Sequence, residues 1–176
     1  MPCAHDSPAG PSRRRALRII ALGGGAALLT TLPLEARASG HVDLLLLTCM
    51  DYRLMDEIVA YMDGRGLKHG YDHVVLAGAS LGALTDKRPD WGRTFWEHLD
   101  VAIELHKVHK VMVLDHRDCG AYRTFLPEGA VSTPEKELGA HRHYLTKLRA
   151  EIGKRHSGMG VELGLMALDG KVQTIT

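Results

Sequence analysis

The sequence predicts a single α/β domain with a mostly parallel central sheet and helices on both faces. One observation is a set of short apolar runs, such as the four consecutive leucines of residues 44–47, which suit a strand buried on both faces. The other is that segments with apolar residues at helical spacing separate these runs. Strands that alternate with helices require right-handed crossovers, so such strands run parallel. We expect about four strands in this sheet plus a short edge strand.

The expected strands and helices alternate along the chain. Apolar runs predict strands over residues 44–47, 73–76, 110–114 and 161–167. Apolar residues at helical spacing predict helices over residues 54–62, 94–106 and 134–154. Thr133 is a typical N-cap and Pro134 a typical first helical residue, which indicates where the last helix begins. Asp169 and Gly170 form a hairpin-type turn, after which residues 171–175 alternate as the edge strand.

The composition excludes several classes of protein. The chain has 176 residues, of which 45% are hydrophobic and 24% charged, as in soluble globular domains. Its net charge of +1, with no basic stripe beyond the N-terminus, argues against a nucleic-acid binder, and 5% aromatic residues are few for stacking on single strands. Three cysteines are too few for a small protein held together by disulfides.

Residues 1–38 have the pattern of a cleavable export signal that resembles the twin-arginine type. Residues 12–14 read Ser-Arg-Arg, residues 19–34 carry no charge, and residues 36–38 read Ala-Arg-Ala, an A-x-A cleavage pattern. The apolar stretch is shorter than the roughly 20 residues of a membrane-spanning helix, and an uncleaved anchor is the alternative. We therefore expect export to the periplasm, no stable membrane insertion after cleavage, and a mature domain over residues 39–176.

Both cysteines of the expected domain follow the ends of strands. Cys49 lies just beyond the first strand, and Cys119 lies just beyond the third strand together with His116. In proteins with open parallel sheets, ligand-binding and catalytic residues lie beyond the carboxyl ends of the strands. Packing does not require this placement, so it indicates a functional site.

Two thiols and an imidazole suggest a bound zinc ion. Zinc accepts cysteine sulfur and histidine nitrogen in tetrahedral geometry, and three protein ligands leave a fourth position for water, as in catalytic sites. Cys49, His116 and Cys119 supply this set of ligands for one zinc ion per chain. The three-residue separation of His116 and Cys119 allows a tight turn to direct both at one ion.

Asp51 and Arg53 are the candidate catalytic residues. Two thiolates and a neutral imidazole cancel the charge of Zn²⁺, so such a site needs help to hold hydroxide. Asp51 can accept a hydrogen bond from the bound hydroxide, while Arg53 can pair with Asp51 in a bidentate fork that keeps it ionised. A free Asp51 could instead ligate the metal and close the site.

These two segments resemble the motifs of a known family. Residues 49–53, Cys-Met-Asp-Tyr-Arg, resemble the Cys-x-Asp-x-Arg motif of β-class carbonic anhydrases, and residues 116–120 resemble their His-x-x-Cys-Gly motif. The resemblance implies that Cys49, His116 and Cys119 bind zinc and that Asp51 and Arg53 form the dyad of the family. It also implies reversible hydration of CO₂ to bicarbonate by zinc-bound hydroxide. Family members are usually homodimers or higher homo-oligomers.

Alternative functions follow from the same residues. A COS or CS₂ hydrolase could use the same zinc site, since some family relatives hydrolyse these linear molecules. Residues 76–80 lack the Arg-Asn-Ala-Gly that family members commonly carry after the second strand. A noncatalytic protein with a closed zinc site, or with a disulfide between Cys49 and Cys119, belongs to a different class.

Other polar residues receive structural interpretations. We expect Asp118 to be a turn residue and Arg117 to be solvated. His141 and His143 are two residues apart and diverge on a helix; at its surface they could relay protons, but we do not assign them this role.

Overall fold

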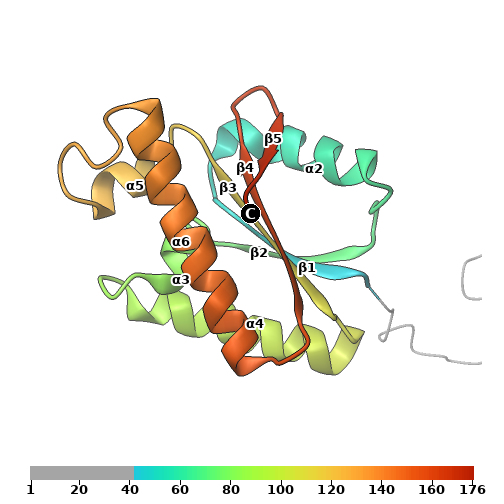
Figure 1. The fold of residues 1–176 in the computed structure, drawn as a ribbon. Helices are drawn as coiled ribbons and strands as arrows, with labels where there is room; N and C mark the ends of the chain where they lie inside the picture. Colours follow the sequence, from blue (N-terminus) through green and yellow to red (C-terminus); the bar gives the residue numbers. More distant parts are fainter. Residues whose placement is uncertain (1–41) are drawn as a thin grey trace, which may run out of the picture. The chain divides into compact units, whose positions relative to one another are not determined.

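The computed structural model describes residues 42–176, in which five strands form one sheet in the order β2-β1-β3-β4-β5 (Figure 1). The strands are β1 Leu44–Thr48, β2 Tyr71–Val75, β3 Lys110–His116, β4 Gly160–Met166 and β5 Val172–Thr174. Strands β1 to β4 pair in parallel, and β5 pairs antiparallel with β4 at one edge. The predicted fold class, with its parallel sheet and short edge strand, is confirmed.

The helices connect these strands and cover the sheet. They are the 3₁₀ helix η1 Tyr52–Leu54 and the α-helices α2 Met55–Gly64, α3 Ser80–Leu84, α4 Pro89–His106, α5 Gly120–Phe125 and α6 Pro134–Arg155. The Thr133 hydroxyl accepts a hydrogen bond from the Lys136 amide at 3.3 Å, so the predicted cap of α6 is confirmed. Helix α4 begins earlier than the apolar spacing predicted, because Pro89 starts it with a polar turn.

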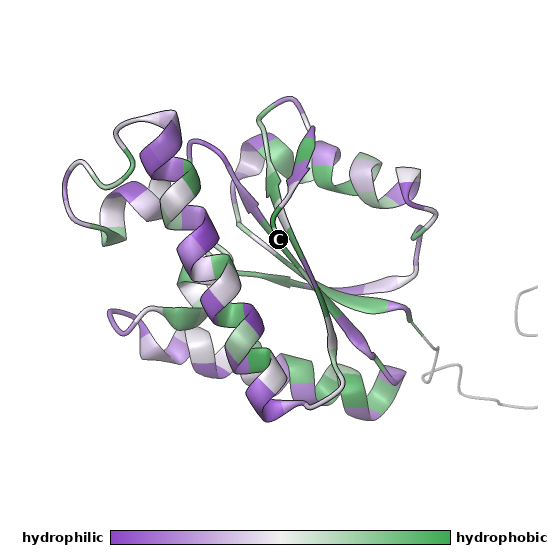
Figure 2. Cartoon of the chain, in the orientation of Figure 1, coloured by the Kyte–Doolittle hydropathy of each residue, from purple (hydrophilic) through white to green (hydrophobic). Residues whose placement is uncertain are grey.

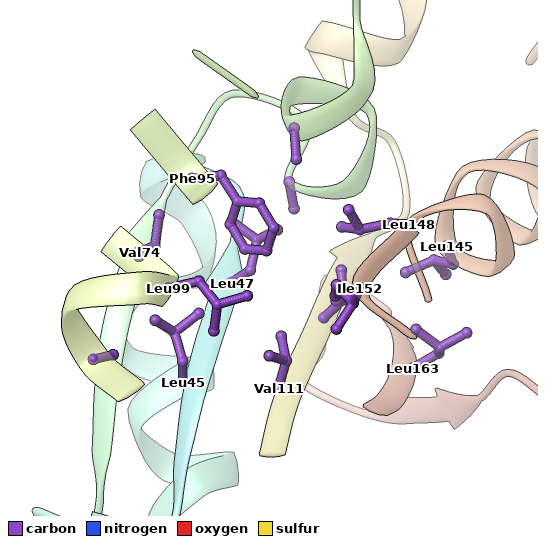
Figure 3. Packing of buried hydrophobic residues seen from close by; sticks show 14 of the residues in the cluster. Leu45, Leu47, Val74, Phe95, Leu99, Val111, Leu145, Leu148, Ile152 and Leu163 are labelled. Atoms are coloured by element: carbon purple, nitrogen blue, oxygen red, sulfur yellow. The ribbon is translucent and has the colours of Figure 1, made fainter. Parts of the chain in front are cut away.

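Hydrophobic side chains pack on both faces of the sheet. On one face, Leu45 and Leu47 of β1 pack in a cluster with residues of α4 and α6, including Phe95, Leu99 and Leu148 (Figure 3). On the other face, alternate residues of β1 pack with α2; the buried members of that cluster include Leu44, Leu46, Ile58 and Met62. Because both faces of β1 are covered, a continuous leucine run is what this strand requires. Figure 2 shows the resulting pattern, with hydrophobic central strands and helices of mixed hydropathy.

The topology brings two distant segments of the chain together. Strands β1 and β3 are neighbours, with Thr48 opposite Leu114 in the register. Cys49 follows β1 directly, and His116 is the last residue of β3. The segments that carry the predicted site therefore leave the sheet side by side at its carboxyl end.

The predicted export signal, residues 1–38, lies outside the described residues. Within residues 42–176, helices long and apolar enough to cross a membrane are absent.

Candidate metal centre

The structure brings Cys49, His116 and Cys119 together at the carboxyl ends of β1 and β3. One sulfur or nitrogen atom of each residue lies within 4.8 Å of the others, and all three side chains are buried. The two sulfur atoms are 3.9 Å apart. A tetrahedral zinc ion with bonds of about 2.3 Å to sulfur would separate them by about 3.8 Å. Both cysteines of the described residues are free, and a disulfide would require a sulfur separation of about 2.05 Å.

The hydrogen bonds of His116 leave one ring nitrogen available to a metal. Its Nδ1 donates to the carbonyl oxygen of Arg117 at 2.8 Å. Its Nε2 is buried and, among the described residues, has no hydrogen-bond partner. Buried polar atoms are rarely left unpaired, and a histidine that binds metal usually donates its other nitrogen to an acceptor. The arrangement at His116 therefore fits a metal ligand.

Cys49 is held in a form that can bind a cation. The backbone amide of Gly78 donates to its sulfur at 3.2 Å. Hydrogen bonding with Cys119, and the nearby His116 and Gly78, lower the pKa of Cys49 to about 4 although burial opposes this. The thiolate in turn raises the pKa of Cys119. A buried thiolate calls for a positive partner, and a soft divalent metal such as zinc meets that requirement.

Asp51 and Arg53 form a bidentate ion pair beside the cluster. Arg53 donates from Nε to Oδ1 at 2.9 Å and from Nη2 to Oδ2 at 2.8 Å, while its backbone amide donates to Oδ1 at 3.1 Å. These hydrogen bonds lower the pKa of Asp51 to about 2, so the carboxylate is ionised at neutral pH. Oxygen Oδ2 lies 3.8 Å from Nε2 of His116. The carboxylate is therefore held at the edge of the cluster by Arg53.

Asp118 extends this ion pair, which differs from its expected role as a turn residue alone. It does occupy the turn, with a φ of 60°. Its carboxylate also accepts a hydrogen bond from Nη1 of Arg53 at 2.8 Å, and its carbonyl accepts one from Nη2 at 3.1 Å. Arg123 pairs with the other carboxylate oxygen. Asp118 thus adds two hydrogen bonds to those that Arg53 makes with Asp51, and these hold the direction of the guanidinium group.

A cleft of about 460 Å³ opens beside these residues. Its lining includes Cys49, Asp51, Arg53, Asp118, Arg123 and Phe125. A molecule in the cleft could therefore reach Cys49, a candidate metal ligand, and the carboxylate of Asp51. The cleft is large enough for a small substrate.

Comparison with known proteins identifies the family. Residues 41–138, more than half of the chain, match the family described as "Putative carbonic anhydrase". The chain belongs to this carbonic anhydrase family. The matched segment includes Cys49, Asp51, Arg53, His116 and Cys119.

Related sequences and a solved structure are also similar to this chain. An uncharacterized protein from Rickettsia bellii is 39% identical over 131 residues, which cover 74% of this chain and 80% of the relative. An uncharacterized protein from Rickettsia conorii is 40% identical over 131 residues, covering 74% and 70%. The carbonic anhydrase of Streptococcus mutans has a similar fold, with a TM-score of 0.54 at 18% identity over 93% of this chain and 94% of that one.

Behind the cluster, this carbonic anhydrase family member carries a buried polar network that the sequence did not predict. Asp115 accepts hydrogen bonds from the Ser80 hydroxyl and the Tyr122 hydroxyl, both at 2.7 Å, and from Nδ1 of His141 at 2.8 Å. His141 is fully buried, so its expected position at the helix surface is wrong, whereas His143 is exposed as expected. The network ties α3, α5 and α6 to the end of β3.

Arg117 is also bound, where we expected it to be solvated. Its Nη1 donates to Oε2 of Glu137 and to the carbonyl of Pro134, both at 3.1 Å. Its Nη2 donates to the side-chain oxygen of Gln173 at 3.2 Å. The spacing of charges along the sequence does not reveal this, because the partners come from α6 and β5.

Proposed function

We propose that this chain is a zinc-dependent carbonic anhydrase that reversibly hydrates CO₂ to bicarbonate. Cys49, His116 and Cys119 are the proposed zinc ligands, with one zinc ion per chain, and Asp51 and Arg53 form the proposed catalytic dyad. The observation that carries the proposal concerns Nε2 of His116, which is buried and has no hydrogen-bond partner among residues 42–176. It lies within reach of two sulfur atoms and 3.8 Å from a carboxylate oxygen. Membership of the carbonic anhydrase family supports it.

Zinc held by three protein ligands would supply Lewis acidity, which generates a nucleophile from water at neutral pH. The side chains of this protein complete the site. Cys49 is held as the thiolate that zinc requires, and Nε2 is the ring nitrogen of His116 that would supply an electron pair to zinc.

Asp51 would orient the attacking water. Its carboxylate is ionised and can accept a hydrogen bond at Oδ2, which directs an oxygen lone pair of that water toward CO₂ in the cleft. Arg53 holds both carboxylate oxygens, and this fork opposes movement of Asp51 into the position of a fourth metal ligand. The ion pair therefore favours an open, catalytic zinc site over a closed, noncatalytic one.

Stopped-flow hydration of CO₂ by the zinc-loaded protein tests the proposal. We expect strong acceleration between neutral and mildly alkaline pH, loss of bound zinc in Cys49→Ser, and a loss of at least about a hundredfold in Asp51→Ala. Asp56→Ala removes an exposed carboxylate of α2 and should retain full activity.

The outcomes separate the alternatives. A zinc-loaded protein without CO₂ hydration contradicts the proposal, and hydrolysis of COS or CS₂ by the same sample would then assign the substrate. Full activity in Asp51→Ala would remove the dyad from the mechanism.

We further propose that residues 1–38 are a twin-arginine-type signal and that the chain functions in the periplasm as a homodimer or larger homo-oligomer. The basic, apolar and small-residue regions of that segment support export. Mass spectrometry of the periplasmic protein should find Ser39 as its first residue, and replacement of Arg13 and Arg14 by lysine should retain the protein in the cytoplasm. Light scattering of the mature protein measures its molar mass and so the number of subunits; a monomer would contradict the proposed homo-oligomer.

A further inference from the structure

One peptide group lies between the ring of His116 and the carboxylate of Glu137. The carbonyl oxygen of Arg117 accepts the hydrogen bond from Nδ1 of His116 at 2.8 Å. The amide of the same peptide group, which belongs to Asp118, donates to Oε1 of Glu137 at 2.6 Å. The carboxylate is therefore connected to the candidate metal ligand through a single peptide group.

This connection affects how His116 presents its nitrogen atoms. Hydrogen bonds in a chain polarise one another, so a carboxylate on the amide makes the carbonyl oxygen a better acceptor. A stronger hydrogen bond to Nδ1 fixes the tautomer in which Nε2 carries the lone pair, and it orients the ring. In many metal sites a carboxylate contacts the histidine directly, whereas here the peptide group lies between them.

The same hydrogen bond holds an unfavourable backbone conformation. Asp118 has a φ of 60°, in the left-handed region that costs a residue with a side chain about 1 kcal/mol. This residue lies between His116 and Cys119, so its conformation sets how both ligands approach one point. The Glu137 carboxylate binds the amide of Asp118 and stabilises that turn.

Glu137 is itself well positioned for this role. Its other carboxylate oxygen accepts from Nη1 of Arg117 at 3.1 Å, and its side chain is only 16% exposed. It also lies in the first turn of α6, where the helix dipole favours a negative charge. The geometry thus fixes its carboxylate rather than leaving it to rotate in solvent.

We propose that Glu137 is a positioning residue that sets the affinity and geometry of the metal centre through the Arg117–Asp118 peptide group. This rests on the proposed function, since it requires that His116 bind a metal. The end of β3 stays attached to α6 by the hydrogen bond between Asp115 and His141, so the fold does not depend on Glu137 alone.

Chelator competition with Zn²⁺ measures the affinity of the mature protein and its variants. We expect Glu137→Ala to bind zinc 10- to 100-fold more weakly, the range found when partners of metal ligands are removed. Glu137→Gln keeps an oxygen acceptor for the amide and should lose less than Glu137→Ala. The control is Glu151→Ala, which removes a carboxylate from the same helix where it pairs with Lys154. It should bind zinc as the parent protein does.

The visible spectrum of the Co²⁺-loaded protein reports the geometry independently of activity. At saturating Co²⁺, the ligand-field bands of Glu137→Ala should shift or broaden relative to the parent protein, whereas those of Glu151→Ala should not. Glu137→Gln should give a spectrum closer to that of the parent protein. This pattern would distinguish a change at the metal from a general loss of stability.

The outcomes separate the two proposals. If the parent protein binds neither Zn²⁺ nor Co²⁺, the metal centre and the proposed function fail together. If the parent binds both ions, and Glu137→Ala has the same affinity and spectrum, only the role of Glu137 is overturned. An equal loss in Glu151→Ala would also overturn it, because the effect would then belong to the helix as a whole.

Discussion

At the scale of single residues, hydrogen bonds decide which atoms are available at the metal centre. The Nδ1 atom of His116 donates to the carbonyl of Arg117, so Nε2 is the ring nitrogen that can bind a metal together with the two sulfurs. Both oxygens of Asp51 are engaged by Arg53, which keeps the carboxylate ionised and at a defined place. The nitrogen available on His116 and the position of the Asp51 carboxylate thus follow from their hydrogen-bond partners and not from residue type alone.

Gly78 is a residue whose replacement should affect both the fold and the metal centre. Its φ is +78°, and a Cβ there would lie 3.0 Å from the Cβ of Ala121. We expect Gly78→Ala to lower the free energy of unfolding by about 1–2 kcal/mol and to weaken zinc binding, since the amide of Gly78 donates to Cys49.

Urea denaturation and zinc titration measure these effects. Gly139→Ala is the matched control, because a Cβ at this position in α6 has open space around it. It should leave zinc binding unchanged and raise stability by up to about 1 kcal/mol. Equal stability in the two variants would show that the backbone at Gly78 is not strained by a side chain.

The residues that the sequence could indicate are those whose position along the chain is itself informative. Cys49, His116 and Cys119 follow predicted strands, and the parallel topology requires these strand ends to meet at one edge if the strands are neighbours. Glu137 and His141 could not be found in this way. Their roles depend on how α6 rotates against the end of β3, and this rotation is set by packing across the whole domain.

At the scale of elements, the sequence predicted the longer α-helices and missed the short ones. The helices α2, α4 and α6 each bury an apolar face, and their apolar spacing identified them. The helices α3 and α5 have only 5 and 6 residues, too few to show a helical period. Yet these two begin at or just after the site, where they carry Ser80 and Tyr122 into the network of Asp115.

Glu162 links three elements at the opposite end of the sheet from the metal centre. Its carboxylate pairs with Lys110 of β3 at 2.8 Å and with Arg65, which follows α2, at 2.7 Å. Burial raises the pKa of Glu162, but the hydrogen bonds from Lys110 and Arg65 outweigh burial and lower it below its ordinary value. The ionised carboxylate therefore stabilises the folded state, at a partly exposed position where solvent screens the effect.

We expect Glu162→Gln to lower the free energy of unfolding at pH 7 by about 0.5–1 kcal/mol. A carboxylate whose pKa is lowered on folding contributes stability above its unfolded pKa, and this contribution is lost as pH falls through the folded pKa. The difference between the two proteins should thus shrink below about pH 4. Urea denaturation across this range measures it, and a difference that grows toward acidic pH would contradict the ion pairs.

At the scale of the whole molecule, the candidate metal centre connects segments that are far apart in the sequence. Cys49 follows β1, whereas His116 ends β3 and Cys119 follows the next turn. The elements η1, α2, β2, α3 and α4 lie between β1 and β3 along the chain. An ion bound to all three would link the neighbouring strands β1 and β3 at their carboxyl ends. Metal binding should therefore stabilise the whole domain and not the loop alone.

Calorimetry with and without zinc tests this coupling. We expect removal of zinc by a chelator to lower the unfolding temperature, because an ion that binds only the folded state adds about 4 kcal/mol at a thousandfold excess over its dissociation constant. Cys49→Ser should show little change on chelation. An unfolding temperature of the parent protein that is unaffected by chelation would indicate that metal binding and folding are not coupled.

Metal analysis combined with X-ray absorption spectroscopy at the zinc edge shows whether Cys49, His116 and Cys119 bind one zinc ion. We expect about one zinc per chain, with two sulfur neighbours at about 2.3 Å and one histidine nitrogen at about 2.0 Å, and loss of bound zinc when Cys49 is replaced by serine. A freshly purified protein without zinc, or one in which Cys49 and Cys119 form a disulfide, would contradict it.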